Sequence, residues 1–360
     1  MDVTPGPELA QTVTLQPFLT LTTSGGAHAA TIDAPVVLAP MAGITDLPFR
    51  RIVAGFGAGF VVSEMVASQE MAQAKPSARA RARTELDSEL GLTEARTAVQ
   101  LAGRDPYWMA EAARMVADGG AQIIDINMGC PAKKVVGGLS GSALMRAPDH
   151  ALRLIEAVVG AVDVPVTLKT RLGWDDGSLN AALLARRAVD AGVAMVTIHG
   201  RTRCQFYKGR ADWRAIGAVV RAVPEVPVLA NGDICGPGDA RAALADSGAA
   251  GVMIGRGAQG RPWLLAQVTA ALLGRAVPLA PRGAALVDLV AAHHAAMLSF
   301  YGRDLGLRVA RKHLGWYCDA AGGAPLLRRR LLTSTDPAEI LRLLPDALSA
   351  APSDQPQEAA

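Results

Sequence analysis

The chain has 360 residues, of which half are hydrophobic and 4% are aromatic, and its formal net charge is +3. This composition supplies ample material for a large core, and such mild basicity is weak evidence for a polyanionic partner. The four cysteines stand far apart, with neither a CxxC pair nor a Cys/His metal spacing. Their spread argues against a metal site and a disulfide framework and suits a reducing compartment.

The first ten residues lack the charged-then-apolar pattern of a signal peptide. No run of eighteen consecutive apolar residues occurs, so a membrane span is not expected. We therefore expect a cytoplasmic protein that uses neither a membrane nor a metal.

Short apolar runs recur along the chain and start roughly 24 to 44 residues apart, which is the room that a strand, a helix and two loops need. Apolar rather than alternating runs are typical of strands buried on both faces. The count of eight favours a (β/α)₈ TIM barrel over about residues 35–275, with a doubly wound open sheet as the alternative. The predicted strands are Val36–Ala39, Phe60–Ser63, Thr97–Leu101, Gln122–Ile126, Val166–Lys169, Ala194–Ile198, Val226–Ala230 and Gly251–Gly255.

Segments between these strands have helical character, for example Pro106–Ala117 and Leu179–Ala191. In the second of them we place Leu183, Leu184 and Ala188 on the buried face. Glycines within two residues of the end of each segment, Gly119 and Gly192, are typical of helix C-terminal caps.

The strand–helix rhythm ends after Pro278–Pro281, where two prolines and small residues indicate a linker. Residues 284–318 and 325–350 then read as helices, which predicts a small C-terminal all-α domain after the α/β barrel. Seven Lys or Arg residues at 301–330 make it a candidate phosphate-binding surface, with a solvated helix face as the alternative. We divide the chain into an N-terminal segment without strong signals at 1–34, the barrel at 35–280, the helical domain at 281–350 and a flexible tail at 351–360.

Polar or glycine-rich residues end every predicted strand. In a TIM barrel the chemistry takes place at these carboxyl ends. Taken alone, each has an ordinary explanation: Asn231-Gly232 is a turn signal and Asp46 a helix cap. Together they indicate a functional face.

Cys130 is the most informative of these residues, because it follows a predicted strand and stands between Gly129 and Pro131. We expect Gly129 to adopt backbone angles closed to other residues, and Pro131 to fix φ, so that the thiol is aimed. A lone cysteine is otherwise often a small buried hydrophobic residue.

The last two strand ends, Asn231–Asp233 and Gly255–Gly257, carry glycines and a cation. Loops at these positions of a TIM barrel often bind phosphate. Lys169, in mid-barrel, is placed to stabilise an anionic ring. These patterns predict a phosphate-containing ligand, and flavin mononucleotide (FMN) is one that would suit them.

Several motifs carry a resemblance to a known family. They are residues 39–46 (APMAGITD), 125–134 (DINMGCPAKK), 199–203 (HGRTR), 231–234 (NGDI) and 253–263 (MIGRGAQGRPW). In this order, over about residues 35–345, they resemble the tRNA-dihydrouridine synthases. The Cys-Pro-Ala-Lys-Lys segment and residues 311–317 (RKHLGWY) resemble the bacterial B-type branch.

The resemblance implies an FMN-binding barrel with a helical tRNA-binding domain. Such an oxidoreductase acts on a CH–CH bond, reducing the C5–C6 double bond of particular tRNA uridines with NADPH. Cys130 matches the family's proton donor. The residues that would bind FMN are Pro40, Met41, Ala42, Gln100, Lys169, His199, Arg201, Asn231, Gly232, Asp233, Gly255 and Arg256. Candidate substrate-binding residues are Asn127, Arg171, Arg311 and Lys312, and we expect a monomer without bound metal.

Reduction of uracil requires a hydride at C6 and a proton at C5, and a flavin N5 can supply the hydride. An ordinary thiol, with a pKa of about 8.5, is mostly protonated at neutral pH and can supply the proton. The loop Ala132–Ser142 is a candidate lid, with an ordinary surface loop as the alternative. A uridine in folded tRNA must first be extruded from its stack.

Two other functions are compatible with parts of the sequence. One is a flavin barrel that acts on a free pyrimidine or another small conjugated substrate, although such an enzyme needs no basic helical domain. The other is a non-catalytic RNA-binding protein on a barrel scaffold.

Overall fold

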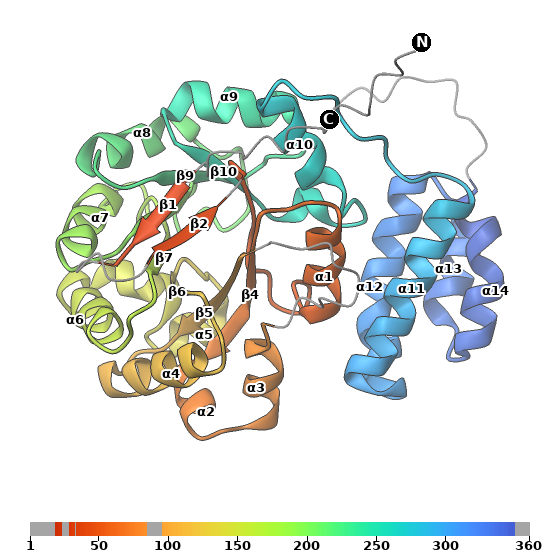
Figure 1. The fold of residues 1–360 in the computed structure, drawn as a ribbon, viewed down its shortest axis with the longest axis horizontal. Coiled ribbons are helices and arrows are strands. Elements are labelled where there is room, and N and C mark those ends of the chain that lie inside the picture. The colour runs from red at the N-terminus through yellow and green to blue at the C-terminus, as the bar shows by residue number, and fades with distance from the viewer. Residues whose placement is uncertain (1–18, 24–28, 33, 85–95, 350–360) are drawn as a thin grey trace, which may run out of the picture.

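The computed structural model describes residues 19–23, 29–32, 34–84 and 96–349, so the tail at 351–360 lies outside the described residues. Eight parallel strands close into a barrel, and helices surround it (Figure 1). The predicted TIM barrel followed by a helical C-terminal region is confirmed. In barrel order the strands are β10 (Gly251–Ile254), β3 (Val36–Leu38), β4 (Phe60–Ala67), β5 (Arg96–Ala102), β6 (Ile123–Met128), β7 (Val166–Arg171), β8 (Met195–His199) and β9 (Val228–Asn231).

Three helices of the barrel begin at an aspartate that caps the helix. Asp46, Asp105 and Asp212 each accept a hydrogen bond from a first-turn amide of the helix that follows. The helical segments are α1 (Leu47–Gly55), α2 (Ser68–Ala72), α3 (Pro76–Ala82), α4 (Pro106–Asp118), α5 (Lys133–Gly137), η2 (Gly141–Arg146), α6 (Pro148–Val159), α7 (Ala181–Asp190), α8 (Trp213–Ala222), α9 (Pro237–Ser247), η3 (Arg256–Ala258) and α10 (Leu264–Leu272).

The barrel interior changes from apolar to polar along the strands. Outward-facing side chains such as Leu168 and Ile198 pack against the helices and form the main core. Inward-facing residues alternate with them. On β8 the order is Met195 in an apolar layer, then Thr197, then His199 at the carboxyl end. The carboxyl end of the barrel is therefore its polar end.

An N-terminal hairpin closes the opposite end. It comprises β1 (Leu19–Thr22) and β2 (Ala29–Ile32), which pair antiparallel. Leu21 and Ile32 are buried against the apolar interior layer, and the Arg96 guanidinium donates to Thr31. Sequence analysis found no strong signal here, because four-residue strands are too short to show a period.

The C-terminal region contains four helices rather than the two expected. They are α11 (Ala284–Tyr301), α12 (Arg303–Ala321), α13 (Pro325–Thr333) and α14 (Pro337–Leu348). Gly302, at φ 76°, separates the first pair, and Asp336 caps α14 after a short turn. Among the described helices, α11 alone is long and apolar enough to cross a membrane. Its buried Val290 and Met297 belong to the core of this helical region.

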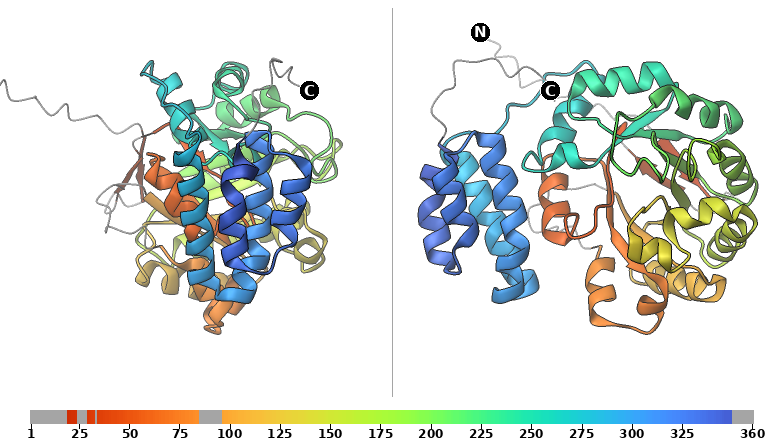
Figure 2. Two further views of the ribbon diagram at one scale, coloured as in Figure 1. Left: turned by 90° about the vertical axis from the view of Figure 1, so that its right-hand side faces the viewer. Right: turned by 180° about the vertical axis from the view of Figure 1, so that it is seen from behind.

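The helical region lies beside α1 and α10 (Figures 1 and 2). The Tyr301 hydroxyl donates to Asp46 at 3.0 Å, and the Phe49 ring on α1 packs against His313 at 5.1 Å between centroids. Gly260, after β10, lies so close to α12 that an added Cβ would come 2.3 Å from the Trp316 carbonyl oxygen. The helices thus dock on loops that follow strands β3 and β10.

The buried face of α7 differs from the expected one. Leu183 is 56% exposed, whereas Leu184 is fully buried. The buried stripe is Ala181, Leu184, Ala185 and Ala188, which has the i, i+3, i+4, i+7 spacing of a helix face.

These two adjacent leucines should respond differently to mutation. Leu184→Ala should lower the free energy of unfolding by about 2–5 kcal/mol, because it leaves a cavity. Leu183→Lys should stay within about 0.5 kcal/mol of wild type. Urea unfolding followed by circular dichroism measures both, and a large loss for Leu183→Lys would contradict the assigned face.

Candidate active site

A cavity of about 720 Å³ opens at the carboxyl ends of the barrel strands, within the range of small-ligand sites. Most of the residues singled out from the sequence line it: Pro40, Met41, Ala42, Gln100, Asn127, Cys130, Lys169, Arg171, His199, Asn231, Gly232, Asp233, Gly255 and Arg256. Arg201 is buried and contacts His199 and Asp233. Arg311 and Lys312 lie on α12.

Sequence reasoning missed other residues that line the cavity, among them Phe206, Tyr207, Cys235, Gln259 and Arg261. They stand inside loops, away from the strand ends that the sequence pattern marks. One signal was present: Phe206 and Tyr207 are adjacent aromatic residues in a polar loop of a chain with few aromatics.

A buried carboxylate marks the start of the polar layer. Asp125 accepts hydrogen bonds from the Thr167 hydroxyl (2.6 Å) and the Gln100 side-chain amide (2.7 Å). Burial raises the pKa of Asp125 to about 6, and the two hydrogen bonds oppose that rise. Both hydrogen bonds are donated to Asp125, so it acts as an acceptor on each side.

The turn that carries Cys130 is held from several sides. The Asn127 carbonyl accepts from the Cys130 amide at 3.0 Å, and Ser142 donates to the Cys130 carbonyl from its hydroxyl (2.9 Å) and its amide (3.1 Å). Arg171 Nε donates to the Gly129 carbonyl at 2.7 Å. These bonds fix the backbone on both sides of the thiol.

Gly129 does not adopt the left-handed conformation, because its φ lies outside that region. Gly141 meets the requirement for glycine instead. Its φ is 59°, and an added Cβ would lie 2.8 Å from the Cys130 carbonyl oxygen. The sequence could not show this, because Gly141 lies eleven positions beyond the cysteine.

Lys169 and Arg171 form a cationic wall on β7. Lys169 Nζ donates to Asn231 Oδ1 at 2.9 Å, and Asn231 Nδ2 donates to the Met253 carbonyl at 2.7 Å. Burial, with Arg171 nearby, lowers the pKa of Lys169 to about 8, and burial lowers the pKa of Arg171 to about 10. Because both charges are disfavoured in the free site, an anion bound beside them would be stabilised.

His199 is held as a neutral imidazole. Burial and the surrounding cations lower its pKa well below 6.5. Arg201 Nη1 lies 3.2 Å from His199 Nε2, and because a guanidinium only donates, Nε2 must accept. The ring proton is therefore on Nδ1, which makes His199 a hydrogen-bond donor.

Asp233 orients two of the cations. Its carboxylate accepts from Arg201, from Arg256 (3.2 Å) and from the Ala211 amide (2.8 Å). It adopts φ 54°, an uncommon conformation for a residue other than glycine, which marks a constrained loop. Beside it, Gly232 has φ 118°, and an added Cβ would lie 2.8 Å from the His199 ring. Only glycine fits there.

Tyr207 stands between two guanidinium groups at the cavity wall. The carbons of Arg171 and Arg256 lie 5.6 and 4.9 Å from the ring centroid, in the range of cation–π contacts. The side chain is 47% exposed. The loop thus presents an aromatic face between cations.

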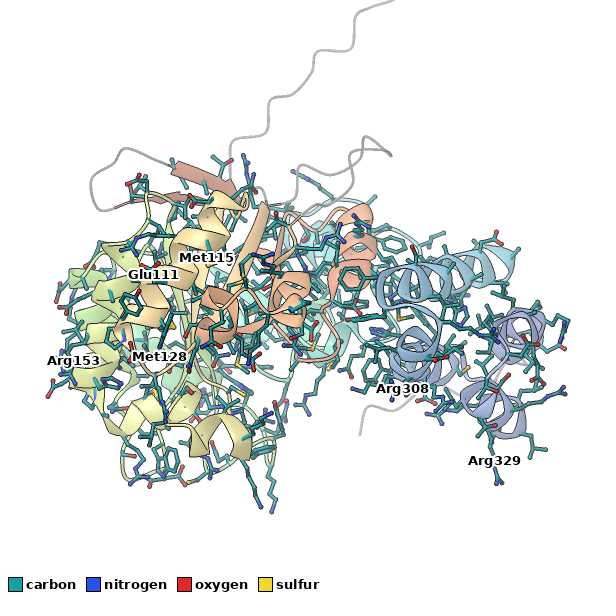
Figure 3. The ribbon with its side chains drawn as sticks, turned by 90° about the horizontal axis from the view of Figure 1, so that it is seen from below. Glu111, Met115, Met128, Arg153, Arg308 and Arg329 are labelled. Atoms are coloured by element: carbon teal, nitrogen blue, oxygen red, sulfur yellow. The ribbon has the colours of Figure 1, made fainter. Side chains whose placement is uncertain are left out.

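The basic stretch of the helical region is only partly free of acidic partners. Arg328 pairs with Asp319, and Arg330 pairs with Glu339. Arg303, Arg308 and Arg311 instead line a second cavity of about 500 Å³ together with Asp304, Leu307 and Thr335. Figure 3 shows Arg308 and Arg329 on the surface of this region.

Lys312 reaches toward the barrel: its Nζ lies 3.2 Å from where a Cβ on Gly43 would be. Of the two α12 residues predicted to bind substrate, it is therefore the one beside a loop of the main cavity.

A TIM barrel that gathers a thiol, several cations and glycine loops at its carboxyl end is typical of a barrel enzyme with an anionic ligand. The family model for dihydrouridine synthase matches residues 37–352. The chain belongs to the dihydrouridine synthase family, whose members are oxidoreductases that act on the CH–CH bond of uridine. The resemblance inferred from the sequence is confirmed.

Individual relatives agree with this assignment. A probable tRNA-dihydrouridine synthase of Rhodobacter capsulatus is 67% identical over 318 residues, 88% of this chain and 96% of that protein. tRNA-dihydrouridine synthase B of Xanthomonas campestris is 48% identical over 289 residues, 80% of this chain and 84% of that protein. A solved 2-naphthoyl-CoA reductase complex, 13% identical with a TM-score of 0.53, covers 71% of this chain and 52% of that one, and shows the fold alone.

The free site should be less stable than a variant without its buried charge. Lys169→Met should raise the free energy of unfolding at pH 7 by about 1 kcal/mol, because the ammonium is incompletely solvated. The folded-state pKa of Lys169, about 8, lies below its ordinary 10.5. Wild type should therefore gain stability relative to the variant between pH 8 and 10.5, as the folded protein loses this proton first.

Guanidinium unfolding at pH 7, 8.5 and 10 on cofactor-free protein measures this difference. A difference that widens with rising pH would contradict the assigned pKa shift.

Proposed function

We propose that the protein is an FMN-dependent tRNA-dihydrouridine synthase that reduces the C5–C6 double bond of specific uridines in tRNA with NADPH. The observation that carries the proposal is that the Cys130 thiol opens into the same cavity as Lys169 and the glycine loops after β9 and β10. A proton donor and an anion-binding wall then face one ligand.

The cavity residues fit a flavin mononucleotide. Gly232, where a Cβ would collide with the His199 ring, lines the cavity, and the Arg256 guanidinium is oriented by Asp233, as phosphate binding requires. Lys169 and the His199 Nδ1 proton would donate hydrogen bonds to the flavin ring. Pro40, Met41 and Ala42 supply an adjacent wall.

When bound, the flavin would supply the hydride to uracil C6 after reduction by NADPH. Cys130 would deliver the proton to C5 as negative charge develops there. Its turn, fixed at both the amide and the carbonyl, keeps the thiol in place during the transfer. Arg171, which holds that turn, would also favour the negative charge that develops on the base.

The helical region would bind the tRNA while the target uridine is extruded into the cavity. Arg303, Arg308 and Arg311 offer cations for phosphates, and Lys312, next to Arg311 in the chain, lies against Gly43. We place the activity in the cytoplasm and expect the enzyme to act as a monomer.

The proposal is tested by mapping dihydrouridine in tRNA from a strain lacking the gene, with and without the cloned gene. Dihydrouridine should disappear at particular positions and return on complementation. The purified protein should be yellow and should restore those positions in unmodified tRNA with NADPH. If the tRNA stayed unchanged while a free pyrimidine was reduced, the small-substrate function would replace this one.

Cys130→Ala should retain flavin and oxidise NADPH at a rate near wild type, because the thiol is not needed for that half-reaction. Its reduction of tRNA should fall by about 10²–10⁴-fold, the usual contribution of a positioned acid. Cys235→Ala is the matched control, since Cys235 lines the same cavity, and it should behave as wild type. Near-normal tRNA reduction by Cys130→Ala would rule out the proton-donor role.

A further inference from the structure

A chain of hydrogen bonds with one direction runs from Asp125 to the Cys130 turn. Gln100 donates its amide nitrogen to Asp125 and accepts, through its carbonyl oxygen, from the Asn127 side-chain amide at 2.7 Å. The Asn127 carbonyl accepts from the backbone amides of Gly129 (3.3 Å) and Cys130 (3.0 Å). The three side chains in this relay are buried.

Asp125 sets the direction at one end of the relay, because both of the hydrogen bonds it makes are donated to it, by Thr167 and by Gln100. The amide nitrogen of Gln100 must therefore face Asp125, and its carbonyl must face the other way. By the same reasoning Asn127 turns its nitrogen to Gln100 and its carbonyl to the backbone amides that follow. A reversed relay would place two donors against each other in a buried site.

We propose that Asp125 is a positioning residue, whose carboxylate orients Gln100 and Asn127 and thereby holds the turn that presents the Cys130 thiol. The inference rests on the proposed function only where it gives that thiol a catalytic use. It also changes the role of Asn127, which is a support for the cysteine turn in this relay, with both ends of its side chain engaged.

Replacing the carboxylate by an amide of the same shape separates the effect of hydrogen-bond direction from the effect of side-chain shape. In Asp125→Asn, one of the two oxygens becomes an amide nitrogen. Either the nitrogen faces Thr167, whose hydroxyl must then accept and loses the carboxylate that its proton is donated to, or the nitrogen faces Gln100. When the new amide nitrogen faces Gln100, that side chain reverses, and Asn127 reverses after it. The Asn127 nitrogen then opposes the amides of Gly129 and Cys130, and both lose their acceptor.

A second substitution should restore the relay in the opposite direction. In the double variant Asp125→Asn/Asn127→Asp, the new amide at 125 donates to Gln100, and Gln100 donates to the new carboxylate at 127. That carboxylate accepts from the amides of Gly129 and Cys130. Every hydrogen bond of the relay is regained, although the side-chain amides point in the opposite direction.

Hydrogen–deuterium exchange resolved to the amides of Gly129 and Cys130 measures the effect on the cofactor-free protein. Asp125→Asn should speed exchange at both amides about tenfold, and the double variant should return to within about threefold of wild type. Thr167→Val is the control: it removes a bond to the same carboxylate without reversing the relay, and exchange should stay within about twofold.

Unchanged exchange in Asp125→Asn would overturn the inference, and so would a double variant as fast as the single one. Equal acceleration in Thr167→Val would also overturn it, since general loosening of the barrel centre would then be the cause. If Asp125→Asn does not fold, recovery of folding in the double variant supports the relay, and its failure to fold refutes it.

The result is independent of the flavin and the tRNA, so it can be told apart from a failure of the proposed function. On the tRNA assay, Asp125→Asn should lower uridine reduction more than NADPH oxidation. Equal losses in both would place the effect in cofactor binding rather than at Cys130.

Discussion

The structure depends on how one carboxylate is accommodated inside the barrel. Asp125 lies where the interior changes from hydrocarbon to polar side chains, and burial makes its charge unfavourable. Hydrogen bonds from Thr167 and Gln100 offset that penalty. Because both side chains direct a donor at Asp125, the orientation of the hydrogen-bonding groups nearer the cavity is constrained in turn. The apolar layer below it, closed by the N-terminal hairpin, keeps this network away from water.

The sequence predicts the parts of the molecule that depend on local pattern. Hydrophobic runs predict the eight buried strands and their polar ends. The geometry of a barrel then predicts that Lys169, His199 and Asn231 line one cavity. Features set by tertiary contact could not be predicted. The need for glycine at Gly141 arises because the Cys130 carbonyl lies against it, and the helix break at Gly302 comes with a positive φ of 76°.

The helical region contacts a loop that lines the cavity. Tyr301 donates to Asp46, which ends the Met41–Asp46 loop, and residues of that loop line the cavity. Burial raises the pKa of Asp46 to about 6, so this contact holds a carboxylate that is costly to ionise. Within the loop, the Thr45 hydroxyl accepts from the Met41 amide at 2.9 Å. The proposed RNA-binding region and the proposed cofactor-binding loop would therefore be stabilised by the same contact, from Tyr301 to Asp46.

Two cysteines face the cavity, and the difference between them shows what an acid needs there. Cys235 donates its backbone amide to Asp239 at 2.8 Å, and burial, with that carboxylate nearby, raises the pKa of its thiol. Cys130 is held at its amide, at its carbonyl and through the preceding carbonyl, which Arg171 engages. A proton delivered to one carbon of a planar base must come from a fixed direction. The number of bonds that restrain the backbone therefore favours Cys130 for this role, more than the presence of a thiol in the cavity does.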